Sequence, residues 1–139
     1  MKLTFKGGIH PYEGKELTMD KDVIEYVPKG DMVYPLSQHI GAPAKAVVKK
    51  GDRVLVGQLI AEAGGFVSAN IHSSVSGTVK AVEPRLTASG SKVNSIVIEN
   101  DNQFEEIEYV KNDKPLAELT KEEILEAIKD AGVVIIKEL

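Results

Sequence analysis

Residues 48–60 read VKKGDRVLVGQLI, and residues 76–79 read SGTV. In the first stretch, short apolar groups stand on either side of Gly51-Asp52 and of Gly57. Glycine supplies the positive φ that a tight turn requires, and an aspartate beside it can accept a hydrogen bond from its own backbone. These stretches therefore predict short strands joined by tight turns, and they decide the fold class.

Outward from this stretch, similar apolar segments recur about every eight to twelve residues between Gly, Pro and Asp, a spacing typical of β-sandwiches and barrels. Residues 27–33, VPKGDMV, also repeat the pattern of residues 48–54, VKKGDRV. The repeat indicates either internal pseudo-symmetry or one turn motif used twice. The predicted strands cover residues 23–27, 32–36, 44–49, 54–62, 66–71, 77–82 and 93–99, with an acidic edge strand over 105–110 and a strand fragment over 133–136.

The two ends of the chain differ from this β-rich part. Residues 1–22 are rich in Gly, Lys, Asp and Pro without periodicity, which predicts an extended arm. Near the other end, Thr120 and Glu123 have the spacing of a helical capping box, and Gly132 is placed to stop the helix that follows. The predicted division is an arm over residues 1–22, a β domain over residues 23–110, and a linker with a carboxy-terminal helix over residues 111–139.

Composition limits the chemistry. A chain of 139 residues can build one core without cross-links. The sequence has no cysteine, which excludes disulfides, thiolate nucleophiles and cysteine-ligated zinc or iron–sulfur centres. The net charge of −4 argues against a nucleic-acid partner. No apolar run is long enough for a membrane helix and no secretory signal is visible, so we expect a cytoplasmic protein without direct membrane insertion.

Residues 48–60 together with 76–79 resemble lipoyl and biotinyl carrier domains, and this resemblance implies a mainly β, barrel-sandwich hybrid fold. In such carriers a lysine at a hairpin tip holds the cofactor. Here Phe66 takes that position, and no lysine lies between Lys50 and Lys80, so a swinging-arm role is excluded on chemical grounds. The tip, Gly64-Gly65-Phe66, is interpreted as a flexible turn that presents one aromatic ring, which either folds onto its own sheet or contacts a partner.

A second resemblance covers nearly the whole chain. Its motifs are FKGGIHP at residues 5–11, PLSQHIGAPA at residues 35–44, and residues 64–79, GGFVSANIHSSVSGTV. Together they resemble the amino-terminal part of the C subunit, RnfC, of Rnf-type ion-translocating electron transport complexes.

That resemblance implies a peripheral subunit on the inner face of the cell membrane, in contact with other subunits of the complex, which transfers electrons between NADH and ferredoxin. It implies FMN, NADH and 4Fe-4S clusters for the full-length subunit only. Where the family continues into a glycine-rich nucleotide-binding loop, residues 131–139 read AGVVIIKEL. We therefore expect a redox domain beyond this chain and no cofactor within it.

The chain has three histidines, His10, His39 and His72, and histidine is the commonest metal ligand in proteins. Their spacing is not that of metal ligands. The favoured function is a non-catalytic scaffold or docking domain, with no catalytic, cofactor-binding or metal-binding residues and with Gly64, Gly65 and Phe66 as a partner contact. The alternative is a stand-alone barrel-sandwich carrier or phosphocarrier-like protein, in which His39 and His72 would form the phosphoryl-transfer pair.

Overall fold

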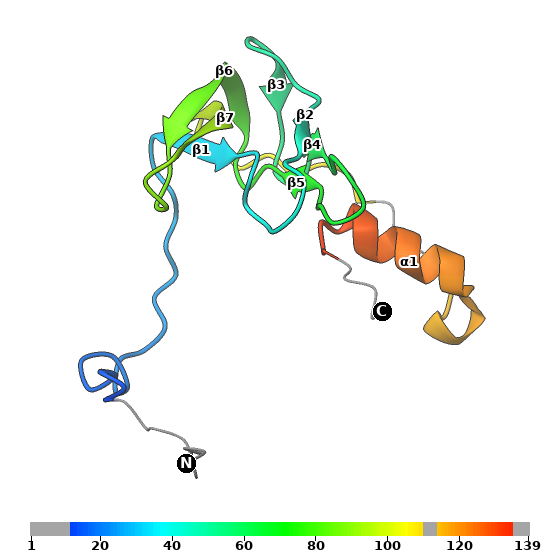
Figure 1. Ribbon diagram of the computed structural model, residues 1–139, viewed down its shortest axis with the longest axis horizontal. Helices are drawn as coiled ribbons and strands as arrows, with labels where there is room; N and C mark the ends of the chain where they lie inside the picture. The colour runs from blue at the N-terminus through cyan, green and yellow to red at the C-terminus, as the bar shows by residue number, and fades with distance from the viewer. Residues whose placement is uncertain (1–11, 110–113, 135–139) are drawn as a thin grey trace, which may run out of the picture.

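A computed structural model describes residues 12–109 and 114–134 (Figure 1). One sheet has four strands in the order β1-β7-β6-β3, the other has three in the order β2-β4-β5, and neighbouring strands are antiparallel. This confirms the predicted fold class, mainly β with a carboxy-terminal α-helix. The elements are β1 (Asp31–Pro35), β2 (Lys45–Ala46), β3 (Arg53–Val54), β4 (Leu59–Glu62), β5 (Ile71–His72), β6 (Gly77–Leu86), β7 (Lys92–Asn100), the 3-10 helix η1 (Leu116–Glu118) and α1 (Lys121–Asp130).

The β6–β7 hairpin is the longest paired unit. Its strands pair from Gly77 opposite Asn100 to Leu86 opposite Lys92. The register shifts between Val79 and Ala81, which is a β-bulge, and such a bulge bends a strand and increases its twist. The bend lets β6 pair with β7 along its length and still place Gly77 beside β3.

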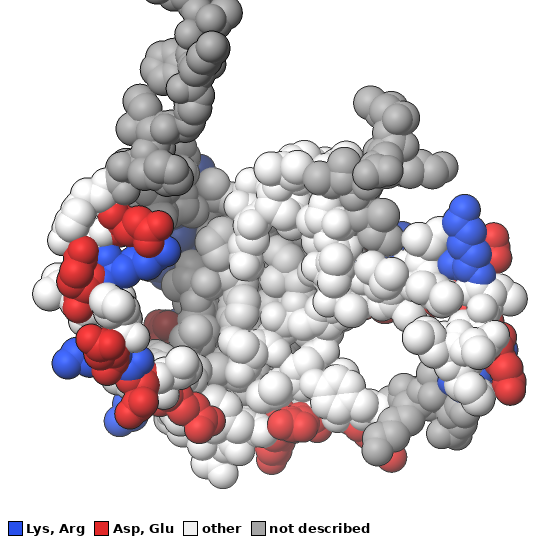
Figure 2. Space-filling view, turned by 90° about the horizontal axis from the view of Figure 1, so that it is seen from below, with Lys and Arg blue, Asp and Glu red and all other residues white. Residues whose placement is uncertain are grey.

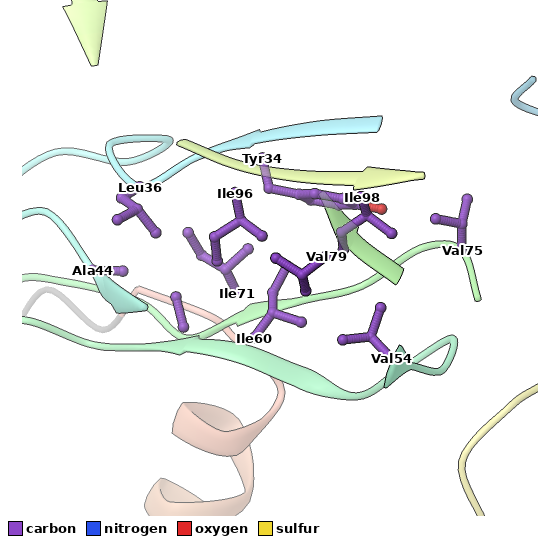
Figure 3. Packing of buried hydrophobic residues seen from close by; sticks show 11 residues of the cluster. Tyr34, Leu36, Ala44, Val54, Ile60, Ile71, Val75, Val79, Ile96 and Ile98 are labelled. Carbon is purple, nitrogen blue, oxygen red and sulfur yellow. The ribbon is translucent and has the colours of Figure 1, made fainter. Parts of the chain in front are cut away.

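The core lies between the two sheets (Figure 3). Ile60 from β4, Ile96 from β7 and Val79 from β6 are fully or almost fully buried. Burying one such side chain contributes about 1.5–3 kcal/mol. Tyr34 from β1 is also buried, and its hydroxyl lies 2.9 Å from the Ser74 Oγ. The core is therefore aliphatic, as a sequence with few aromatic residues suggests.

The two Gly-Asp turns share their backbone geometry but not their packing. Gly30 and Gly51 both have positive φ, 79° and 94°, and each precedes an outer strand of the four-stranded sheet. The valines at matching positions differ, because Val33 is 42% exposed while Val54 is fully buried. The repeat therefore extends to the conformation of the turn. It does not extend to the burial of the valine that follows, because only one of the two enters the core.

Several predicted strands do not form as expected. Residues 22–29 have no strand pairing, so the prediction of a strand over 23–27 is wrong; its apolar pattern is local, whereas a strand needs a neighbour. Of residues 66–71, β5 contains Ile71 alone, and the remainder is a loop. The predicted edge strand over 105–110 is reduced to an isolated bridge between Glu106 and Val56, and its last residue lies outside the described part.

Helix α1 forms as the sequence predicts. The Thr120 Oγ1 accepts the Glu123 N–H, and the Glu123 carboxylate accepts the Thr120 N–H. At the other end Gly132 has φ 77°, and the Val133 N–H donates to the Ile128 carbonyl, a hydrogen bond typical of helix stops. Residues 133–134 then continue without strand pairing, contrary to the predicted fragment, whose residues 135–136 lie outside the described part.

The predicted division into arm, β domain and helical region stays a prediction. In Figure 1 the chain before β1 runs away from the two sheets, and α1 projects from the end of the domain where β5 lies. Residues 1–11 of the predicted arm and residues 110–113 of the predicted linker lie outside the described part.

Candidate functional site

The tip between β4 and β5 is held by hydrogen bonds to its own loop and to a second loop over residues 37–43. The Ser68 Oγ accepts the Gly64 N–H (2.9 Å) and donates to the Ala42 carbonyl (2.8 Å). The Ala42 N–H donates to the Val67 carbonyl (2.9 Å). The side chain of Asn70 accepts the Ala63 N–H (2.9 Å). Two loops distant in sequence therefore form one hydrogen-bonded unit.

The glycines of this unit allow close approach of the backbones. A Cβ at Gly64 would overlap the Pro43 carbonyl oxygen, and a Cβ at Gly65 would lie 3.0 Å from the Ala42 Cβ. Neither Gly64 nor Gly65 has positive φ. The sequence favoured flexibility as the reason for this glycine pair, whereas the structure shows that a side chain would not fit at Gly64 and would crowd Ala42 at Gly65.

Phe66 stands on this supported tip with 80% of its surface exposed. The interpretation in which the ring folds onto its own sheet is therefore wrong. Contact with a partner, through Gly64, Gly65 and Phe66, stays a prediction. The tip forms one wall of a groove of about 500 Å³. The groove is lined by Ala63, Gly65, Phe66 and Ser68 from the tip and by Leu125, Glu126, Lys129 and Val133 from α1 and its end.

His39 and His72 line a second cavity of about 360 Å³, beside Asn70 and Gly132. The structure thus brings together the pair that a phosphocarrier would need. The His39 Nε2 accepts the Ala69 N–H (3.2 Å), which assigns the ring proton to Nδ1, and this nitrogen donates to the Ile40 carbonyl (3.0 Å). Both nitrogens of His39 are engaged with backbone groups, an arrangement typical of a structural histidine. His10 lies outside the described part.

The residues present do not fit the metal centres of the implied full-length subunit. A 4Fe-4S cluster needs thiolate ligands, and the sequence has no cysteine. Within residues 12–109 and 114–134, no three or more His, Asp or Glu side chains gather in a way that could hold a metal ion. We therefore assign no metal centre to the described residues.

Sequence reasoning missed a polar network at the other end of the domain. The Arg53 guanidinium donates to Asp101 (2.9 Å) and to Glu105 (2.7 Å). The fully buried Ser76 donates through its hydroxyl to Asp101 (2.6 Å) and accepts the Glu105 N–H (3.1 Å). The Ser76 hydroxyl, the backbone N–H of Gln103 and Arg53 together hold the pKa of Asp101 below its usual range. The network fastens the turn after β7 to β3, and its sequence signal was the serine of the 76–79 motif.

Charged side chains are unevenly distributed on the surface. On the face shown in Figure 2 they gather toward the two ends, one of which is the end with α1; the visible middle is mostly uncharged, with acidic side chains along its lower edge. No helix in the described part of the chain is long and apolar enough to cross a bilayer. An uncharged surface between charged ends is suited to protein contact.

Comparison with known proteins assigns the family. Residues 3–103 match the family described as the RnfC barrel sandwich hybrid domain. The chain is 43% identical over 135 residues to the C subunit of the proton-translocating ferredoxin:NAD(+) oxidoreductase complex of Clostridium ljungdahlii, covering 96% of this chain and 29% of the relative. It is 45% identical over 132 residues to the C subunit of the Na(+)-translocating complex of Acetobacterium woodii, covering 94% and 30%.

A more distant relative gives the same result. The C subunit of the ion-translocating oxidoreductase complex of Vibrio cholerae is 38% identical over 131 residues, covering 93% of this chain and 17% of the relative. The chain thus spans less than a third of the length of these curated relatives. It belongs to the RnfC barrel sandwich hybrid domain family, the amino-terminal region of RnfC.

Proposed function

We propose that this chain is a non-catalytic docking domain of RnfC in an Rnf-type ion-translocating ferredoxin:NAD oxidoreductase complex. The observation that carries the proposal is Phe66, an exposed aromatic ring on a tip fixed by hydrogen bonds and close glycine packing. Aromatic residues on a rigid support are typical centres of protein interfaces. The names of the relatives support membership of such a complex.

The mechanism is positional. In the full-length subunit, FMN, NADH and 4Fe-4S clusters would supply the electron-transfer chemistry, and this domain would hold the parts that bind them in place. Electron transfer slows steeply when cofactors are misplaced, so a rigid scaffold has a functional effect without touching a reacting atom. The aliphatic core and the Arg53 network give the domain that rigidity. Contacts with other subunits would keep it peripheral on the cytoplasmic face of the membrane.

A chimera tests the docking role. The matched region of the Acetobacterium woodii relative is replaced by residues 1–139, and the tagged chimera is co-expressed with the rest of its complex. We expect the other subunits to co-purify, and Phe66→Asp to reduce their recovery about tenfold or more, since central interface aromatics contribute about 2 kcal/mol or more. Leu86→Asp is the matched control, because Leu86 is similarly exposed at the far end of β6.

Two results would contradict the docking role. One is normal recovery of the complex with Phe66→Asp. The other is a purified 139-residue chain that binds FMN or NADH tightly, measured by absorbance and isothermal titration, because the domain would then take part in the chemistry itself.

The phosphocarrier alternative has one observation in its favour, the shared cavity of His39 and His72. Against it, both His39 nitrogens are hydrogen-bonded to backbone groups. Incubation with a phosphohistidine donor followed by intact-mass measurement decides, since a phosphoryl group adds a distinct increment. We expect no increment.

A further inference from the structure

Helix α1 is only partly covered by the rest of the molecule. None of its residues is fully buried, although its sequence has an apolar face. Leu125 on this face is 40% exposed, and Val133 beyond the helix stop is also exposed. Across the groove stands the exposed ring of Phe66. A helix of this length is marginal in water unless its apolar face is packed. A further segment of protein bound in this groove would bury that face and stabilise the helix.

The groove also lies where the described chain ends. Val133 lines the groove, and Val134 lines the neighbouring cavity with His39 and His72. Whatever follows Val134 in the polypeptide is tethered to the groove by the chain itself. A short tether gives effective concentrations of about millimolar, far above those of a free partner in a cell. Among possible occupants, the following segment of the same chain is therefore strongly favoured.

The lengths of the relatives show that such a segment exists in them. The matched regions cover 29% and 30% of the Clostridium ljungdahlii and Acetobacterium woodii proteins, so about 70% of each lies outside the match. Because this family is the amino-terminal region of RnfC, most of that length follows the match. The last described residues of this chain, Val133 and Val134, are themselves apolar.

We propose that the groove between the tip and α1 is the seat of the part of the full-length subunit that follows Leu139. The inference rests on the proposed function in one respect, that this chain acts as the first domain of such a subunit. The seated surface would be apolar where it meets Phe66 and Leu125. Glu126 and Lys129, which also line the groove, carry opposite charges and provide a polar rim.

This seating gives the tip a more specific role. Phe66 would fix the angle between the β domain and the rest of its own subunit, so the surface that the subunit presents to the other subunits would depend on this ring, and Phe66→Asp would weaken assembly through the lost angle. Packing of the following part against α1 would also complete the burial of the helix, so that the two parts behave as one rigid body. The exposed aromatic ring is then an anchor inside the subunit.

Single-cysteine labelling tests the proposal, since the chain has no cysteine of its own. Three variants are prepared, Phe66→Cys and Leu125→Cys in the groove and Leu86→Cys as the exposed control at the end of β6. Each is made in the 139-residue chain and in the full-length chimera, the Acetobacterium woodii relative whose matched region is replaced by residues 1–139. Iodoacetamide labelling rates at each position are read by peptide mass spectrometry, which separates these sites from cysteines of the relative.

We expect the labelling rates at positions 66 and 125 to fall at least about tenfold in the full-length chimera alone, with the rate at position 86 unchanged. Equal rates in the two contexts would overturn the proposal. So would protection that appears only when the other subunits are added, because the occupant would then be one of them. Failure of the proposed function looks different: positions 66 and 125 are protected in the chimera, but the chimera does not assemble with its complex.

Discussion

The tip over residues 63–70 and the chain before β1 over residues 12–30 both expose apolar side chains, but they are supported differently. This segment extends past the predicted arm of residues 1–22 and is called the arm below. The tip is bonded to a second loop through Ser68 and His39, and within itself through Asn70. The arm has a local turn in which the Lys15 carbonyl accepts backbone N–H groups, and it is tied to the domain where the Asn100 side chain donates to the Pro28 carbonyl (3.0 Å). Exposure alone therefore does not define a docking site.

The difference matters because ordering a free segment costs conformational entropy on binding. A residue held in one conformation loses little when a partner arrives, whereas each rotamer-rich side chain that is immobilised costs about 0.5–1.5 kcal/mol. The backbone that carries Phe66 is already ordered in this sense. Val23, which is 100% exposed, and its neighbours in the arm would have to be ordered by whatever binds them.

Among the variants compared here, we expect Gly64→Ala in the tip to lower the free energy of unfolding most. The added methyl would overlap the Pro43 carbonyl oxygen, so the two loops must separate. Overpacking of this kind costs about 2–3 kcal/mol in the free energy of unfolding, measured by urea denaturation. The matched arm variant is Gly14→Ala, which has positive φ but an open surrounding.

Because the arm hardly contributes to the folded domain, we expect Gly14→Ala to change the free energy of unfolding by less than about 0.5 kcal/mol. Equal losses in the two variants would mean that arm and tip unfold as one unit, and the contrast between them would be lost.

We expect Ser68→Ala to lower the stability of the domain by a smaller amount. This substitution leaves the Gly64 N–H and the Ala42 carbonyl without their partner at a nearly buried position. Unpaired buried polar groups cost about 1–3 kcal/mol, and we expect a value near the lower end because solvent is close. Differential scanning calorimetry of this variant beside Thr18→Ala, which removes an exposed 3.3 Å hydrogen bond in the arm, gives the comparison.

For Thr18→Ala we expect no resolvable change in melting temperature. A Ser68→Ala protein as stable as the parent would show that the tip is not held by the hydrogen bonds of this serine, and Phe66 would lose its rigid support.

Elements specified by neighbouring residues were predictable from sequence. Helix α1 begins at a capping box and stops at a glycine, and most of β6 and β7 falls within the strands predicted over residues 77–82 and 93–99. The extension of β6 to Leu86 was not predicted. The prediction of a strand over residues 23–27 was wrong, because apolar alternation does not reveal whether a partner strand exists. The support of the tip was missed for a similar reason. Its contacts join Gly64 to Pro43 and Ala69 to His39, and nothing in either loop indicates the other.

The smallest expected effect on stability is that of removing the arm. A chain that starts at Pro28 keeps the carbonyl that accepts from Asn100 and loses Val23, Ile24 and Tyr26, which bury little against the domain. We expect its free energy of unfolding to stay within about 0.5 kcal/mol of the parent. Limited trypsin digestion of the intact chain gives a second measurement, since Lys15 and Lys21 lie in the arm.

Cleavage at these two lysines needs no unfolding of the domain, whereas trypsin can cut within a strand only after that strand has unfolded. With a domain stability of a few kcal/mol, the arm should be cut on the order of a thousandfold faster than Lys80, which is in β6 and paired with Asp31. Comparable rates would show that the arm packs on the domain in solution. The apolar residues of the arm would then contribute to the fold of the domain. Their exposure would no longer indicate that the arm becomes ordered only on binding a partner.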